Sequence, residues 1–347
     1  MPSQSATDIR AVLRSGPEVE IGASPHPPKS AHSRMPIILG FAAVYLIWGS
    51  TYLGIRYAVE TIPPLLMMGI RHSLAGALVY AWARRKGTPS PTAQQWGYAV
   101  VAGAFLFLAG HGMLAWAEER VPSGLAALLC ATLPLWTVLL GRTKGAEHRL
   151  GVKAWAGIVL GFAGVALLIG PDSLRQTGNL DLLATAAAMF SAFAWAVGTI
   201  YSKSVRLPNS TVLSASMQML TGGVWLLLAA GVSGEAAQVH VATVTLRSVL
   251  ALAYLTVMGS IVAFTVFTWL LTVASPSRVS TYAYVNPVVA VFLGWTLAGE
   301  AIGVHTIAAT VIILTAVALV NTRGRPNPQQ NGRAAVAMSA AQPTAAD

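Results

Sequence analysis

Residues 36–56 read PIILGFAAVYLIWGSTYLGIR, and the only charge in this stretch is its last residue. A helix rises 1.5 Å per residue, so about 20 apolar residues are needed to cross the hydrocarbon core of a bilayer. The stretch is long enough and apolar enough to do so. It therefore predicts a membrane-spanning helix.

Nine further apolar runs of similar length follow, and most connections between them are short. In chain order the ten runs are 36–56, 65–83, 96–116, 122–140, 152–170, 180–201, 211–231, 248–271, 277–298 and 302–321. We therefore predict an all-α integral membrane protein with ten transmembrane helices.

The overall composition agrees with a membrane protein. The chain has 347 residues, of which 55% are hydrophobic and only 10% are charged, whereas soluble domains carry about 25% charged residues. The net charge of +10 raises the question of nucleic acid binding. However, the basic residues cluster in short segments between apolar runs, as in cytoplasmic loops of membrane proteins. We expect membrane lipids, and no nucleic acid, as partners.

The Lys and Arg distribution predicts the orientation. With ten spans and a cytoplasmic N-terminus, 17 of the 22 basic residues fall in cytoplasmic segments. Only Arg56, Arg120, Arg175 and Arg247 fall outside, and Arg71 lies within a helix. This asymmetry follows the positive-inside rule. Both termini are expected in the cytoplasm. The high Ala and Gly content suggests a GC-rich bacterial genome, so we expect the membrane to be a bacterial inner membrane.

The two ends of the chain differ from the apolar middle. Residues 1–35 and 323–347 are polar and lack an apolar period, so we predict disordered cytoplasmic tails. Met35 directly precedes the first run, and whether Met1 or Met35 is the true start stays open.

Distinctive residues recur at a nearly constant spacing. Trp48 and Trp195, like Gly76 and Gly223, are 147 positions apart. Later pairs are 153 apart: Trp116 with Trp269, Pro134 with Pro287, and Glu147 with Glu300. This offset predicts a duplication with repeats at 36–171 and 179–322. Each repeat has five spans, an odd number, so the second copy crosses the membrane in the opposite sense, as in the inverted repeats of secondary transporters.

Several motifs appear in a characteristic order. They are residues 46–52 (LIWGSTY), Pro63-Pro64 with Arg71, residues 121–127 leading to Pro134, and residues 282–288 leading to Gly299-Glu300. With them, residues 36–321 resemble the EamA-type family of the drug/metabolite transporter superfamily. The resemblance implies a twofold-repeated, ten-helix transporter that moves amino acids, metabolites, nucleotide sugars or drugs, often outward.

The resemblance also implies a central cavity formed by helices 1, 3, 4, 6, 8 and 9. On these helices we expect solute-binding side chains at Trp48, Ser50, Thr51, His111, Trp195, Tyr282, Tyr284 and Asn286. Structural or gating roles are expected for Arg71, Trp116, Pro134, Trp269, Pro287 and Glu300. The sequence departs from the family pattern at one position: Glu147 of the first copy lies in a basic loop. Glu147 and Glu300 therefore need not have equivalent roles.

Polar groups within the bilayer are costly and need partners or a water-filled cavity. His111 is the only ionisable group that we place near the bilayer centre, because Glu118-Glu119 are assigned to an outer loop. His111 could bind solute, couple transport to protons, or simply bond a neighbouring helix. Arg71 could anchor an anionic solute group, bond helix-end carbonyls, or extend to the outer headgroups.

Trp and Pro positions have ordinary structural interpretations as well. Trp116 and Trp269 lie near helix ends and suit the interfacial aromatic belt, while Trp48 and Trp195 lie deeper. Pro134 and Pro287 each remove a helix hydrogen bond and are expected to bend their helices. Small residues at Gly157, Gly161 and Gly164 suit packing within the chain or between two copies. Monomer and homodimer therefore both stay open.

Motifs for other chemistry are missing from the sequence. It has no phosphate-binding loop, no zinc motif and a single cysteine, Cys130. We expect no enzyme activity, no cofactor and no metal. The favoured function is a secondary transporter that moves a small organic solute by alternating access. The alternatives are an integral membrane enzyme and a scaffold without transport activity.

Overall fold

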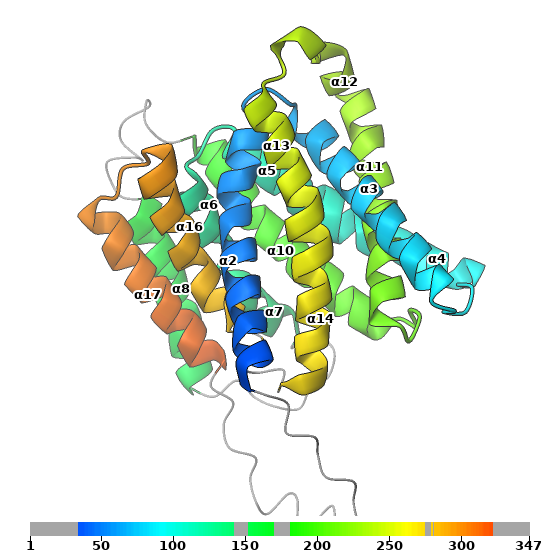
Figure 1. The fold of residues 1–347 in the computed structure, drawn as a ribbon. Coiled ribbons are helices and arrows are strands. Elements are labelled where there is room, and N and C mark those ends of the chain that lie inside the picture. The colour runs from blue at the N-terminus through cyan, green and yellow to red at the C-terminus, as the bar shows by residue number, and fades with distance from the viewer. Residues whose placement is uncertain (1–33, 142–151, 170–180, 275–278, 280, 322–347) are drawn as a thin grey trace, which may run out of the picture. The chain divides into compact units, whose positions relative to one another are not determined.

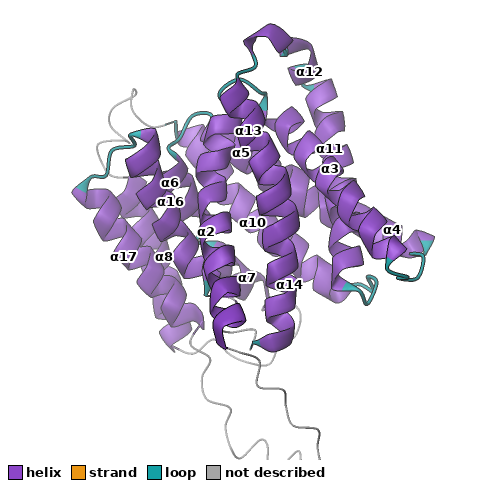
Figure 2. Cartoon of the chain, in the orientation of Figure 1, coloured by secondary structure: helices purple, strands orange, loops and turns teal. Residues whose placement is uncertain are grey.

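The computed structural model describes residues 34–141, 152–169, 181–274, 279 and 281–321. Over these residues every regular element is a helix (Figure 2), which confirms the predicted all-α class. The predicted tails at 1–35 and 323–347 lie almost entirely outside the described residues, and the basic loop with Glu147 lies wholly outside them.

Each of the ten predicted runs contains helix. In the first half the elements are α2 (Arg34–Ala58), α3 (Pro64–Arg85), α4 (Ala93–Gly103), η1 (Ala104–Gly112), α5 (Met113–Glu118), α6 (Ser123–Cys130), α7 (Leu133–Gly141) and α8 (Val152–Ile169). In the second half they are α10 (Leu182–Ser204), α11 (Thr211–Val232), α12 (Glu235–Gln238), η3 (Val241–Thr243), α13 (Leu246–Tyr254), η4 (Leu255–Val262), α14 (Ala263–Val273), α16 (Tyr282–Ala298) and α17 (Val304–Asn321).

Seven helical segments are long and apolar enough to cross a membrane, and three shorter apolar helices accompany them. Large apolar side chains on their outer surfaces are exposed, among them Leu46, Leu183, Leu228 and Phe292. Such exposed apolar surface suits contact with lipid tails rather than with water.

Helices at corresponding positions of the two halves pack against each other: α3 with α11, and α8 with α17. Close approach depends on glycine. A Cβ atom at Gly76 would lie 2.7 Å from the backbone nitrogen of Leu220, closer than real Cβ contacts allow. On α8, Gly161 and Gly164 face side chains of the same chain, on α7 and α17. These two glycines therefore serve packing within the chain.

The two prolines act differently. Pro287 lies inside α16, as predicted. Pro134 does not bend a continuous helix, because α6 ends at Cys130 and α7 begins at Leu133, so Pro134 falls in the first turn of α7. A first-turn residue has no intrahelical N–H partner to lose. The predicted kink is therefore a break just before the proline.

Two helices contain a π-helical segment, in which hydrogen bonds close wider turns. They are η1, between α4 and α5, and η4, between α13 and α14. These two composite helices occupy corresponding positions, the third span of each predicted repeat. Isolated π-turns within α-helices occur frequently at functional sites.

Polar contacts gather at one end of the helices, which we call the upper face (top in Figure 1). Here α2, α5 and α16 end, and α3, α6, α10 and α13 begin. The carboxylate of Glu235 on α12 accepts hydrogen bonds from the backbone nitrogens of Leu65 and Leu66, at 2.9 and 3.1 Å. It thereby caps α3 from the other half of the chain.

Candidate functional site

The two π-helices each contain a glycine that receives a tryptophan from the opposite half of the chain. On η4, Gly259 accepts a hydrogen bond through its carbonyl from the indole nitrogen of Trp48, at 3.1 Å. On η1, a Cβ atom at Gly110 would lie 3.1 Å from the ring of Trp195. Trp48 and Trp195 are the pair predicted to correspond between the repeats. Each of these two tryptophans therefore lies against a π-helical segment of the other half of the chain.

Aromatic side chains surround both tryptophans. The ring of Trp48 lies 5.0 Å, between centroids, from both Phe267 and Tyr282. The ring of Trp195 lies 4.5 Å from His111 and 5.9 Å from Phe107. Four predicted solute-binding residues, Trp48, His111, Trp195 and Tyr282, thus belong to two aromatic groups, one at each π-helix.

His111 has a partner that the sequence interpretation missed. Its Nδ1 atom lies 2.8 Å from the Nε2 atom of His72 on α3. His72 is buried, and its Nδ1 atom has no hydrogen-bond partner among the described residues. His111 is therefore not the only ionisable side chain in the interior.

Arg71, next to His72 on α3, contacts the other π-helix. Its Nε atom donates to the hydroxyl of Ser260 on η4 at 2.9 Å, and its guanidinium packs against Gly259. The side chain is buried, so the alternative in which it reaches the lipid headgroups is wrong. Adjacent residues of α3 thus bind both π-helices, His72 at η1 and Arg71 at η4.

Glu118 also differs from its sequence interpretation. It is the last residue of α5, not part of a loop, and is 0% exposed. No polar atom among the described residues hydrogen-bonds either of its carboxylate oxygens. The helix extends farther than the apolar run suggested, because Arg56 on α2 satisfies its last carbonyls, those of Glu118 and Glu119, at 2.6 and 2.9 Å.

For the predicted residues on α16, the structure describes only some of the side-chain contacts. Asn286 is buried, and its Oδ1 atom has no hydrogen-bond partner within the described part of the chain. Its backbone carbonyl lies close to Gly49 on α2. Tyr284 lies in the helix, but its side chain is outside the described residues.

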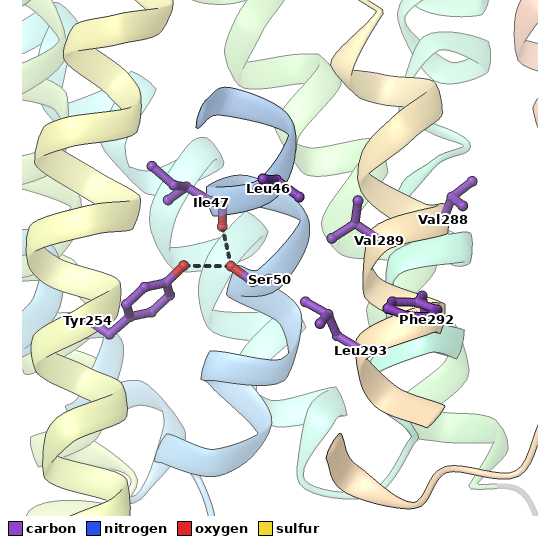
Figure 3. A pocket seen from close by; sticks show the side chains of 8 residues that line it. All are labelled: Leu46, Ile47, Ser50, Tyr254, Val288, Val289, Phe292 and Leu293. Carbon is purple, nitrogen blue, oxygen red and sulfur yellow. Dashed lines mark hydrogen bonds between the residues drawn. The ribbon is translucent and has the colours of Figure 1, made fainter. Parts of the chain in front are cut away.

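The hydroxyl groups of Ser50 and Thr51 form hydrogen bonds within the protein. Thr51 donates to the carbonyl of Trp48 at 2.6 Å, and Ser50 hydrogen-bonds the hydroxyl of Tyr254 at 2.6 Å. Ser50 and Tyr254 also border an apolar cavity of about 490 Å³ between α2, α13 and α16 (Figure 3). The remaining lining is aliphatic or phenyl, and several of these side chains are exposed, so this cavity faces the lipid side of α2 and α16.

A second cavity, of about 550 Å³, opens at the upper face and is polar. Its charged lining residues are Arg56, Glu60, Arg120, Arg247 and Glu300. The three arginines are those predicted on the outer side that fall within the described residues.

Ion pairs and hydrogen bonds around this cavity join the two halves of the chain. Arg247 on α13 lies 3.5 Å from Glu60, which follows α2. Arg120, after α5, lies 3.6 Å from Asp181 at the start of α10. The hydroxyl of Tyr57 donates to the carbonyl of Leu297 at 2.9 Å.

The carboxylate of Glu300 caps the first turn of α6. Its carboxylate accepts hydrogen bonds from the backbone nitrogens of Ser123 and Gly124, at 2.7 and 3.0 Å, and from the Ser123 hydroxyl at 2.7 Å. Gly294 leaves room for this carboxylate, since a Cβ atom there would collide with it. Glu300 is therefore an anionic cap supplied by the other half of the chain.

The remaining predicted residues lie away from the π-helices. The guanidinium of Arg120 stacks 4.1 Å above the Trp116 ring, at the upper face. Trp269 on α14 packs against Gly40 on α2. Among the described residues, no three His, Cys, Asp or Glu side chains are placed to hold a metal ion.

Comparison with known proteins identifies the family. The model of the EamA-like transporter family matches residues 35–170 and 182–322. The "Uncharacterized inner membrane transporter YedA" of Escherichia coli (strain K12) is 37% identical over 289 residues, which cover 82% of this chain and 90% of that protein. The "Probable amino-acid metabolite efflux pump" of Escherichia coli (strain K12) is 28% identical over 286 residues, which cover 78% of this chain and 90% of that protein.

A solved crystal structure shares the fold. It is 21% identical, superposes with a TM-score of 0.54, and the match covers 83% of this chain and 96% of that one. Together with the two family-model matches, which span both halves of the chain, these relatives establish that the chain belongs to the EamA-like transporter family.

Proposed function

We propose that this chain is a secondary transporter that exports a small organic solute, such as an amino acid, metabolite or drug, across a bacterial inner membrane by alternating access. The main support is the matched pair of contacts at the π-helices, Trp48 with Gly259 and Trp195 with Gly110. Each tryptophan comes from one half of the chain and each π-helix from the other, as expected where a solute site lies between two repeats.

The proposal includes ten spans arranged as two inverted five-helix repeats. The seven long apolar segments and the three shorter apolar helices supply ten candidates in total. With this number, the upper face is the outer face, and 17 of 22 basic residues fall on the cytoplasmic side with both termini. Arg56, Arg120 and Arg247, the described arginines expected outside, all border the upper cavity.

The solute site is assigned to the two aromatic groups and the buried polar residues beside them. His111 and Trp195 border η1, while Trp48 and Tyr282 border η4. Arg71 and His72 reach both segments from α3. A solute held here would contact both halves, so moving one half against the other would change its access. Bends at π-turns offer such a movement a natural hinge.

The upper face is closed by contacts between halves in this arrangement. They comprise the Glu60–Arg247 and Arg120–Asp181 ion pairs and the caps that Glu235 and Glu300 provide. Opening toward the outside would require these contacts to separate. Exposed ion pairs contribute only about 0–1 kcal/mol each, which suits contacts that break and re-form in every transport cycle.

Export is proposed as the direction because one relative is named as an efflux pump of amino-acid metabolites. The relative with 37% identity is named as an inner membrane transporter. Each match covers most of this chain and most of the relative, so the similarity extends over nearly the whole of both proteins.

A thermal-shift screen of the purified protein against amino acids, sugars, nucleosides, polyamines and cationic drugs tests the proposal. A solute that binds the folded state raises the melting temperature. We expect a hit that Trp195→Ala weakens and that Trp82→Ala leaves unchanged, because Trp82 is exposed on α3. Proteoliposomes must then exchange the labelled solute. A folded protein that binds and exchanges none of these solutes would contradict the proposal and favour a scaffold.

A further inference from the structure

Glu118 differs from the other acidic residues that the structure describes. Glu60 and Glu119 pair with arginines, Asp181 caps α10, and Glu235 and Glu300 cap helices of the other half. Glu118 alone among these six is fully buried, and neither of its carboxylate oxygens has a hydrogen-bond partner in the described part of the chain. A carboxylate normally loses water on burial only if hydrogen bonds or a paired cation replace it.

The charged neighbours do not supply that replacement. The charged side chains that interact electrostatically with the Glu118 carboxyl group are Arg56, Arg71 and Glu300. Arg56 donates to two backbone carbonyls, and Arg71 donates to Ser260. Neither arginine lies within ion-pair distance of the Glu118 carboxylate.

The other elements around α5 add no charge. From α2 and α6 the titratable neighbours are Tyr52 and Cys130, which are uncharged in their ordinary protonated forms. The buried side chains of α10, which packs against α5, are Ala, Ser and Thr. On α3, His72 reaches His111. The surroundings therefore suit a neutral carboxylic acid better than a carboxylate.

The position of Glu118 links the solute site to the upper face. Glu118 and His111 belong to the same helical span, Ala93–Glu118, and are seven residues apart. Seven residues make two helical turns and return to the same side of a helix, about 10 Å farther along. Glu118 thus lies between the His111 site and the cavity bordered by Arg56 and Glu300.

We propose that Glu118 is a proton-binding site: it holds a proton while the upper face is closed and exchanges it with the outer water when that face opens. The role in coupling transport to protons rests on the proposed transporter function. In such a cycle the carboxyl group binds or releases one proton and forms no other bond.

Infrared difference spectroscopy of the protein in lipid bilayers, between acid and alkaline pH, tests this site with the proton itself as the probe. A protonated carboxyl group gives a C=O stretch that is distinct from that of a carboxylate and shifts in D₂O. All carboxyl groups that take up protons between these pH values contribute to this band, so the variants are compared with the wild type. We expect one component of the band to be present in the wild type and in Glu119→Gln and to be absent in Glu118→Gln. Glu119 is the matched control because it is adjacent, partly exposed and paired with Arg120. A band in Glu118→Gln that equals the wild-type band in every component would overturn the proposal.

A second measurement needs no variant, in case Glu118→Gln does not fold. Dicyclohexylcarbodiimide is an apolar reagent that modifies protonated carboxyl groups in apolar surroundings. Peptide mapping of the labelled wild type should find modification at Glu118 and not at Glu119, with less labelling at alkaline pH. Labelling that spares Glu118 would overturn the proposal. The two proposals fail separately: solute exchange without the Glu118 signal refutes only the proton site, and the signal without any solute refutes only transport.

Discussion

The Nε2 atom of His72 lies 2.8 Å from the Nδ1 atom of His111, and this contact joins α3 to the π-helix η1 within the same predicted repeat. When both rings are neutral, only one of the two nitrogens carries the hydrogen between them. The contact therefore fixes the tautomers of both rings together, and it determines whether the remaining nitrogen of His111 donates or accepts.

Removing one imidazole should leave the other without its partner in the interior. We expect His72→Ala and His111→Ala each to lower the free energy of unfolding by about 1–3 kcal/mol. The double variant should lose clearly less than the sum, since the two changes remove one shared contact. Thermal unfolding in detergent measures these effects, with the exposed His305→Ala as the control. Strictly additive losses would mean that the two rings do not interact.

The hydrogen bond from Trp48 to Gly259 can be removed while most of the ring is kept. Trp48→Phe deletes the indole N–H, so we expect a loss of about 0.5–1.5 kcal/mol in unfolding free energy, together with reduced solute exchange in proteoliposomes. Trp195→Phe is the matched comparison, because the Trp195 indole makes no hydrogen bond to any residue in the described part of the chain. Equal losses in the two variants would show that ring volume, not the Gly259 contact, matters at η4.

Glu300 should contribute to stability as a helix cap. Glu300→Ala removes three hydrogen bonds to the start of α6, so we expect a loss of about 1–2 kcal/mol. Glu119→Ala removes only a surface ion pair with Arg120, and its cost should be about 0–1 kcal/mol. Chemical or thermal unfolding of both variants measures the difference. A harmless Glu300→Ala would argue against the capping role.

The helices could be predicted because an apolar run of about 20 residues has few other solutions in a membrane. The correspondence of Trp48 with Trp195 stays a prediction, which rests on the constant offset in the sequence. The π-helices could not be predicted, because one extra residue in a turn leaves no pattern in an apolar run. The contact of His72 was not predicted. Because His72 lies one residue after Arg71 on α3, its side chain points toward a different helix, η1 instead of η4.

Glu118 was misplaced for a different reason. The apolar run ends near Trp116, and sequence patterns place helix ends only to within a few residues. The helix continues because Arg56, far away in the sequence, satisfies its last carbonyls. Only the tertiary arrangement supplies that partner, so no local signal could have shown that Glu118 is buried while Glu119 reaches the surface.

The carboxyl group of Glu235, which lies outside the membrane spans, should make the stability of the protein depend on pH. Partial burial raises the pKa of its carboxyl group above the usual value, although hydrogen bonds from Leu66 and Leu65 act in the opposite direction. A carboxyl group whose pKa is higher in the folded state stabilises the protein below its unfolded pKa, and this contribution is lost as pH rises through the folded pKa. The stability advantage of wild type over Glu235→Gln should therefore fall as the pH is raised from about 4, near the usual pKa of a glutamate, through neutrality. Unfolding midpoints across this range measure it, and an advantage that grows with pH would show that the backbone hydrogen bonds dominate.

The ion pair between Glu60 and Arg247 should separate when the upper face opens. Both side chains are accessible, and they come from opposite halves of the chain. Cysteines at both positions, in a Cys130→Ala background, can be joined by a short bifunctional thiol reagent. We expect the joined protein to lose exchange of the solute found in the screen and to recover it on reductive cleavage. Glu60→Cys and Arg247→Cys alone, treated in the same way, should keep exchange, because no covalent link then joins α2 to α13. Full exchange by a completely cross-linked sample would mean that these helices do not move apart during transport, and the opening would then have to occur between other helices of the upper face.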